Sequence, residues 1–219
     1  MADKTITKAR GDDSSPLAIC LENINKTFGS VQANKDVCLS VVPGTIHGIV
    51  GENGAGKSTL VSILYGFYSA DSGTVAISGE PVRLRSSADA IAAGIGMVHQ
   101  HFMLVPNFTV LENIILGHEG GSDLKAGARQ AEASLKGITE RYGLSVDLQA
   151  VVQDLPVGLQ QRVEILKALY RGARILILDE PTGVLTPQET EQLFDNLRTL
   201  KAQGVTILLI THKLKEIMA

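Results

Sequence analysis

The sequence contains no tryptophan, and aromatic residues make up only 4% of it. A stacking platform for single-stranded nucleic acid is therefore not expected. Its 20 basic and 23 acidic residues give a net charge of -3, and no block of about five like charges occurs, so the basic field that nucleic-acid binding requires is missing too. No run of about 18 apolar residues suggests a membrane span. We expect a soluble chain of cytoplasmic character with no nucleic-acid partner.

Cysteine is also scarce. Cys20 and Cys38 both lie among strand-forming apolar residues, so we expect two small core residues rather than a disulfide. Residues 1–16 are polar, lack the apolar segment of a signal peptide and are expected to be disordered. The hydrophobic content of 44% allows residues 17–219 to form one domain that carries subdomains.

Apolar stretches separated by turn residues predict strands that alternate with helices, and hence an α/β fold with a mostly parallel core sheet. A small antiparallel β subdomain is expected where a turn at 79–81 joins strands at 74–78 and 82–84. Helical spacing dominates from Gln100 to Pro156, which predicts a helical subdomain over about 101–158, with glycine-rich joints at 117–121. The other predicted strands are 17–24, 37–42, 45–50, 95–99, 174–178 and 205–210, and the helices are 59–67, 86–93, 109–116, 126–142, 159–170 and 187–203.

A complete phosphate-binding loop, G-E-N-G-A-G-K-S, lies between a predicted strand and a predicted helix. Its glycines let successive backbone N–H groups point at phosphate oxygens, and the helix that follows adds a positive dipole. Lys57 is expected to reach the β- and γ-phosphates, and Ser58 to bind Mg²⁺. The candidate ATP-binding residues of this loop are Gly51, Glu52, Asn53, Gly54, Ala55, Gly56, Lys57, Ser58 and Thr59.

Three further buried strands end in polar residues, at the sheet edge where ligands bind in α/β proteins. Asp179 is a candidate Mg²⁺ ligand, and Glu180 a candidate general base for the attacking water. His212 is a candidate contact of the γ-phosphate, and Gln100 a candidate for the metal or water shell. Taken singly, each is also explained as an ordinary solvated group at a strand end. The phosphate loop is what favours the functional interpretation.

Taken in order, these motifs resemble the nucleotide-binding domain of ATP-binding cassette (ABC) transporters, a P-loop NTPase fold. The resemblance covers about residues 17–218 and includes M-V-H-Q at 97–100 and L-P-V-G-L-Q, which is similar to the family's signature segment. It implies that the signature contacts the ATP of a partner domain, and that Phe28 stacks on adenine, although a packed strand aromatic remains an alternative for Phe28. The signature residues are Leu155, Pro156, Val157, Gly158, Leu159 and Gln160.

The segments at 98–114 and 155–182 are similar to the ATPases of bacterial simple-sugar and nucleoside importers. That resemblance implies an ATPase that uses ATP and Mg²⁺ and powers uptake of a small polar solute from the cytoplasmic face of the membrane. Expected partners are a second nucleotide-binding domain, transmembrane permease subunits and, indirectly, an extracytoplasmic solute-binding protein. Because such relatives usually fuse two of these domains, we expect an N-terminal half or a C-terminally truncated domain.

The signature departs from the family's Leu-Ser-Gly-Gly-Gln at three positions. Pro156 replaces the serine and removes both a hydroxyl and a backbone N–H, while Val157 and Leu159 replace a glycine and the glutamine. Thr186 stands where the family usually has an aspartate. Since the signature serves the partner's ATP, we expect an asymmetric pair in which the site completed by Pro156 is impaired.

Two other functions remain as alternatives. A soluble ABC protein of translation or DNA repair would clamp nucleic acid, and the acidic composition argues against it. A P-loop GTPase would need a guanine-reading N-K-x-D segment after the loop. The similar run at 34–36 lies upstream of the loop and has the wrong spacing.

Overall fold

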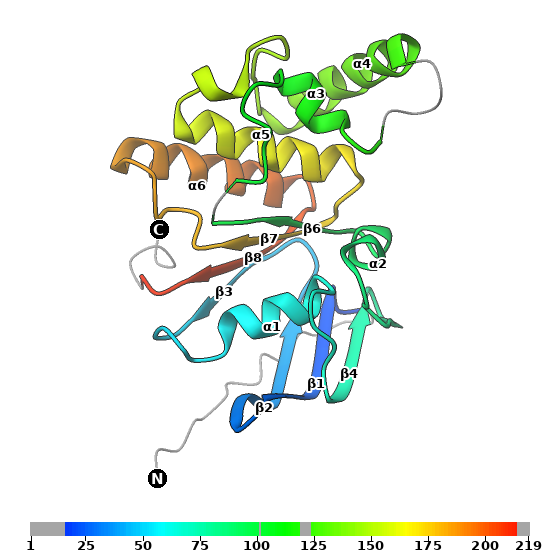
Figure 1. The fold of residues 1–219 in the computed structure, drawn as a ribbon, viewed down its shortest axis with the longest axis vertical. Helices are drawn as coiled ribbons and strands as arrows, with labels where there is room; N and C mark the ends of the chain where they lie inside the picture. Colours follow the sequence, from blue (N-terminus) through cyan, green and yellow to red (C-terminus); the bar gives the residue numbers. More distant parts are fainter. Residues whose placement is uncertain (1–15, 101, 119–123, 214–219) are drawn as a thin grey trace.

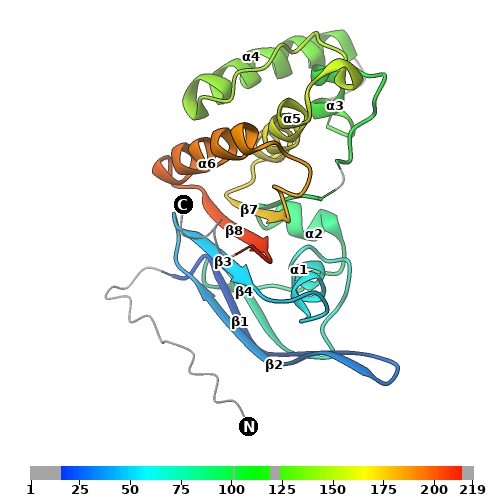
Figure 2. The same cartoon turned by 90° about the vertical axis from the view of Figure 1, so that its left-hand side faces the viewer.

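The computed structural model describes residues 16–100, 102–118 and 124–213, without the side chains of 124–126. The predicted disorder of residues 1–15, the predicted joint at 119–121 and any structure in 214–219 lie outside these ranges. Two four-stranded sheets lie one above the other with helix α1 (Lys57–Leu64) between them, and the remaining long helices cover the far side of the parallel sheet (Figures 1 and 2).

The parallel sheet has the strand order β3-β8-β7-β6, and all of its pairings are parallel. This confirms the predicted core sheet. Strand β7 is buried on both faces because its residues alternate between two cores: Ile175 and Ile177 pack toward α1, and Leu176 and Leu178 pack toward the opposite helices. The strands are β3 (Ile46–Val50), β6 (Ile95–Val98), β7 (Ile175–Asp179) and β8 (Thr206–Thr211).

The antiparallel sheet is larger than predicted, because the first two strands of the chain belong to it. The predicted strand at 82–84 is wrong. Ser78 and Gly79 both have positive φ and make a two-residue turn, so pairing with β4 resumes at once at Glu80. The last bond, from Val82 N–H to Val75 O, is followed by chain that leaves the sheet. The order is β2-β1-β4-β5, with β1 (Ile19–Phe28), β2 (Val31–Val41), β4 (Ser72–Ile77) and β5 (Glu80–Pro81).

The helices follow the predicted pattern, with capping residues at their starts. Ser86 accepts from Asp89 N–H, and Thr109 and Thr186 each form a capping box with a glutamate three residues on. Helices α3 and α4 pack on α5, at the end of the molecule farthest from the antiparallel sheet (Figure 1). The limits 101–158 of a helical subdomain stay a prediction. The helices are α2 (Ser87–Ala92), α3 (Val110–Ile115), α4 (Leu124–Tyr142), 3₁₀ turn η1 (Val152–Asp154), α5 (Val157–Tyr170) and α6 (Pro187–Ala202).

The expectation of two buried cysteines is wrong for Cys38, which is exposed, while Cys20 is half-buried; both are free thiols. The reason is the alternation of side chains along β2: Val37, Leu39 and Val41 pack on the core, so Cys38 lies on the opposite, solvent-facing side of the strand. The sulfur of Cys38 accepts the N–H of Asn23 at 3.3 Å. Among the helices that the structure describes, none has the length and hydropathy that crossing a bilayer takes.

Candidate active site

Four polar segments meet at one edge of the parallel sheet, because parallel strands all end on the same side. Strand β3 ends in the phosphate loop, and β6 is followed closely by Gln100. Strand β7 ends in Asp179 and Glu180, and β8 is followed by His212. A cavity of about 490 Å³ lies at this edge. It is lined by 31–33 of β2, 53–59 of the loop, Gln100, Asp179 and Glu180.

The phosphate loop takes a shape that glycine makes possible. Gly54 and Gly56 both have φ of +84°, in the left-handed region where a side chain is strained. A Cβ at Gly56 would also collide with the carbonyl oxygen of Ala33. The side chain of Asn34, which is only 5% exposed, donates to the Gly56 carbonyl at 3.1 Å. Strand β2 therefore supports the loop from behind.

Lys57 lies in the first turn of α1 and is 9% exposed. Its ammonium group donates to the carbonyl oxygens of Gly51 at 2.7 Å and Glu52 at 3.0 Å, so it closes the two ends of the loop on each other. A buried cation beside backbone N–H groups and a helix N-terminus suits the phosphate chain of a nucleotide. Ser58 and Thr59 line the same cavity. The donor set therefore fits a nucleotide phosphate.

Glu180 has φ of +46°, a left-handed backbone that costs a glutamate about 1–3 kcal/mol. With this backbone its carboxylate lies toward the end of β8, where Oε1 is 3.0 Å from His212 Nδ1. The Glu180 N–H donates to Ile210 O at 2.9 Å and so extends the sheet by one bond. Burial, and then the adjacent Glu180 carboxylate, raise the pKa of Asp179, while Lys57 opposes them. Asp179 and Glu180 therefore have the chemistry of a metal ligand beside a general base.

Gln100 lines the cavity with Asp179 and Glu180. Phe28 does not line it, but pairs with Val31, which does. The Phe28 ring is 41% exposed and meets Tyr68 edge-on at 5.1 Å. Sequence reasoning missed Asn34, since a polar residue on a strand gives no sign of the loop that it supports.

The signature segment lies apart from this cavity. Pro156 precedes α5 as its N-cap and supplies no side-chain cap, and the helix begins at Val157, two residues earlier than predicted. Pro156, Gly158 and Leu159 line a different hollow of about 200 Å³ between α5 and α6. Gln160 donates back to Leu155 O at 2.9 Å. The signature and the phosphate loop of one chain thus do not share a pocket.

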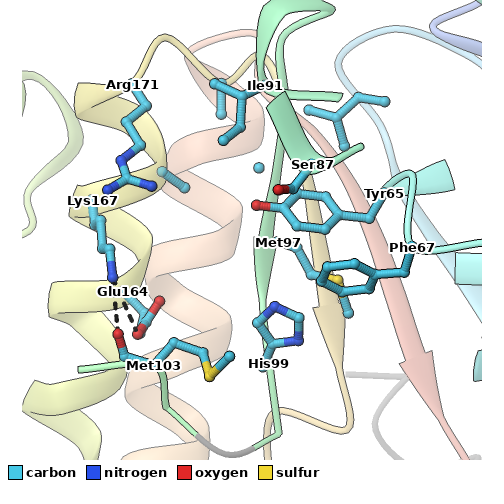
Figure 3. A pocket seen from close by; sticks show the side chains of 14 residues that line it. Tyr65, Phe67, Ser87, Ile91, Met97, His99, Met103, Glu164, Lys167 and Arg171 are labelled. Carbon is cyan, nitrogen blue, oxygen red and sulfur yellow. Dashed lines mark hydrogen bonds and ion pairs between the residues drawn. The ribbon is translucent and has the colours of Figure 1, made fainter. Parts of the chain in front are cut away.

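A third cavity, of about 250 Å³, lies between the end of α1, strand β6 and helix α5 (Figure 3). On one side it presents the rings of Tyr65, Phe67 and His99, and Phe67 stacks on His99 with centroids 5.8 Å apart. On the other side, α5 presents Glu164 and Lys167. Figure 3 shows these groups facing each other across the cavity.

Charged groups on the α5 side of this pocket are mostly buried. Glu164 is only 4% exposed, and burial raises the pKa of its carboxyl. Among the residues that the structure describes, none donates a hydrogen bond to its Oε1, which lies 4.0 Å from the ammonium of Lys167. That ammonium donates instead to Met103 O at 2.9 Å. Glu164 therefore keeps an unsatisfied acceptor inside the pocket.

Residues 34–183 match the sequence profile of the ABC transporter family. The chain is 50% identical to a glucose import ATP-binding protein of Haloferax volcanii, covering 91% of this chain and 41% of that protein. It is 51% identical to a nucleoside import ATP-binding protein of Lactococcus lactis subsp. cremoris, covering 90% of this chain and 39% of the relative. The chain thus spans about two fifths of the length of these relatives.

Solved structures share the fold. A nucleotide-free ATP-binding cassette from an ABC transporter superposes with a TM-score of 0.80 at 29% identity, over 94% of this chain and 84% of that one. A dimeric bacterial ABC transporter cassette gives a TM-score of 0.72 at 29% identity, over 90% of this chain and 89% of that one.

Proposed function

The chain belongs to the ABC transporter family, and from that premise we propose that it is the ATP-hydrolysing subunit of an importer of a small polar solute, a sugar or a nucleoside. The observation that carries the proposal is the meeting of the phosphate loop, Gln100, Asp179 and Glu180 around one cavity. Relatives about 50% identical are named for glucose and for nucleoside import, which supports the solute class. We place the subunit at the cytoplasmic face of the membrane.

In this proposal each site residue has one task. Lys57 and the loop N–H groups hold the phosphates of ATP, and Ser58, Asp179 and Gln100 hold the Mg²⁺. The bound MgATP supplies the phosphoanhydride bond that is broken. Glu180 accepts a proton from the attacking water, and the 3.0 Å contact with His212 fixes the direction of its carboxylate.

We infer that a second nucleotide-binding domain completes the site. No signature residue of the same chain lines the cavity, which supports assigning the signature that closes over the nucleotide to another domain. The dimeric cassette among the structural relatives supports this arrangement. Whether the second domain is fused or separate does not change the geometry.

Restoring serine at Pro156 should raise the ATPase rate of the assembled protein, by about 2–10-fold, because a hydroxyl and a backbone N–H return to the signature that faces the partner's nucleotide. Steady-state phosphate release at saturating ATP measures this. The matched control is Pro187→Ser, which changes the first residue of α6. An unchanged rate in Pro156→Ser would contradict the prediction of two unequal ATP sites.

We propose that a permease segment docks in the pocket between α1, β6 and α5. Phe67 and Met103 line it and are 50% and 64% exposed, so two large apolar side chains present much of their surface to solvent at this pocket. Oε1 of Glu164 is buried without a hydrogen-bond donor among the described residues, and its nearest cation is the Lys167 ammonium at 4.0 Å, so a further donor would stabilise it. His99 lines the pocket, and the next residue, Gln100, lines the nucleotide cavity. A segment seated here would press directly on the end of β6.

The function is tested by tagging the intact protein in its own cells, solubilising the membranes gently and identifying what copurifies. A multi-spanning permease should be recovered with the wild type and with the exposed control Val42→Asp, and lost with Phe67→Asp. Equal recovery of the permease with Phe67→Asp would show that it docks at another surface. Recovery of ribosomes or nucleic acid and no permease would overturn the importer in favour of a soluble clamp.

A further inference from the structure

The carboxylate of Glu189 accepts hydrogen bonds from the starts of two different helices. Oε2 accepts from the N–H and the hydroxyl of Thr186, both at 2.9 Å, which makes the capping box of α6. Oε1 accepts from the N–H of Gly158, at the start of α5, at 3.0 Å. One side chain thus joins the signature segment to the segment that follows Glu180.

The space between Gly158 and the Glu189 side chain is narrow. A Cβ at Gly158 would lie 2.9 Å from Glu189 Oε1 and 3.1 Å from its Cγ, so a larger residue would push the carboxylate away. A side chain at this signature position would therefore weaken the bond between Glu189 and the Gly158 N–H. A second bond runs in parallel, since the buried Gln161 side chain donates to Pro181 O at 2.8 Å. The two bonds hold both ends of residues 181–186 against α5.

The charge of Glu189 suits its position. Hydrogen bonds from Thr186 and then Gly158 lower the pKa of Glu189, which keeps it ionised. A carboxylate at the N-termini of α5 and α6 interacts favourably with both helix dipoles. In the first turn of α5, Pro156 has no N–H and Leu159 N–H is bonded to Pro156 O. Glu189 is thus the group that orients Gly158.

We propose that Glu189 is a positioning residue for ATP hydrolysis: its carboxylate holds the signature segment in register with residues 181–186, which follow Glu180, so that the signature meets a partner's nucleotide in a fixed position. The inference rests on the proposed function, because it assigns the signature to a partner's site. Glu189 itself is not required to touch ATP. A mere helix cap would need only Oε2, and the bond from Oε1 is what the capping role leaves unexplained.

The chain offers a matched control for the test. Glu112 forms a capping box of the same geometry with Thr109, whose N–H and hydroxyl donate to Glu112 Oε2 at 2.8 and 2.9 Å. In the part of the chain that the structure describes, no hydrogen bond joins Glu112 to a second helix. Glutamine also serves at this capping position, so Gln preserves the cap at both sites. At residue 189, however, the single amide oxygen cannot accept from both Thr186 and Gly158, so a glutamine that keeps the cap turns an N–H group toward the Gly158 N–H.

Glu189→Gln in the assembled protein should lower kcat for ATP hydrolysis about tenfold, the loss expected for one hydrogen bond to a charged group. The KM for ATP should not change, because the phosphate loop is untouched. Glu112→Gln should leave both constants at wild-type values. Amide hydrogen exchange at Gly158 should be faster in Glu189→Gln than in the wild type.

Each outcome decides a separate point. A wild-type kcat in Glu189→Gln, or unchanged exchange at Gly158, would overturn the positioning role. If Glu112→Gln lost as much kcat as Glu189→Gln, Glu189 would act only as a helix cap, and the positioning role would again be overturned. If the wild type hydrolyses no ATP and carries no permease, the proposed function itself fails. The exchange measurement still tests the contact in that case.

Discussion

Glu180→Gln is expected to lower ATP hydrolysis by about 10²–10⁴-fold and to leave ATP binding intact. Glutamine has the shape of glutamate and can keep the bond to His212, which is 3.0 Å long in the wild type, but its amide cannot accept a proton from water. The left-handed backbone at residue 180 is retained as well. Phosphate release measures the loss, and equilibrium titration with a fluorescent ATP analogue measures the binding.

The control is Glu191→Gln, which makes the same chemical change on the exposed side of α6. It should hydrolyse ATP at the wild-type rate. Substantial turnover in Glu180→Gln would take the general-base role away from Glu180. Asp179, whose pKa is raised by burial and by its neighbour, would then become the next residue to test.

Lys57→Ala should weaken ATP binding about 10–100-fold, the effect of removing a buried charge-assisted donor from a phosphate site. Hydrolysis at cellular ATP should fall with it. The ammonium now donates to Gly51 and Glu52 carbonyl oxygens, so its absence also frees the two ends of the loop from each other. Equilibrium binding gives the affinity, and thermal unfolding followed by circular dichroism checks that the domain remains folded.

Lys201→Ala, which removes an exposed lysine from the last turn of α6, is the control and should bind ATP as the wild type does. Equal affinity in Lys57→Ala would mean that the backbone N–H groups hold the phosphates unaided. The two predictions separate two events: Glu180→Gln affects the reaction after binding, and Lys57→Ala affects binding itself.

Much of the core fold could be predicted from local patterns. The apolar runs at 175–178 and 206–210 are buried strands, and the polar residues after them lie at one sheet edge, as the parallel arrangement requires. The phosphate loop was identifiable because its glycines are needed for a backbone shape that few other residues adopt. Features of this kind depend on neighbours in sequence.

The features that could not be predicted depend on contacts between residues far apart in the sequence. Asn34 supports Gly56 from 22 positions away, and Glu189 reaches Gly158 across 31. Cys38 is exposed because it lies on the face of β2 opposite to Val37 and Leu39, and only the packing of the rest of the fold decides which face is covered. The strand predicted at 82–84 failed because a tight turn shifted the pairing to Glu80 and Pro81.

Among the strands that the structure describes, β3 pairs only with β8, and this has a consequence for biosynthesis. Its partner in the sheet is β8, and Gly44, just before β3, donates to Thr206 across a separation of 162 residues. During translation the strand that leads into the phosphate loop therefore has its hydrogen-bonding groups exposed until residues 206–211 have left the ribosome. Strands left open in this way invite intermolecular pairing. We expect the growing chain to depend on chaperones until β8 emerges, and to bind nucleotide only afterwards.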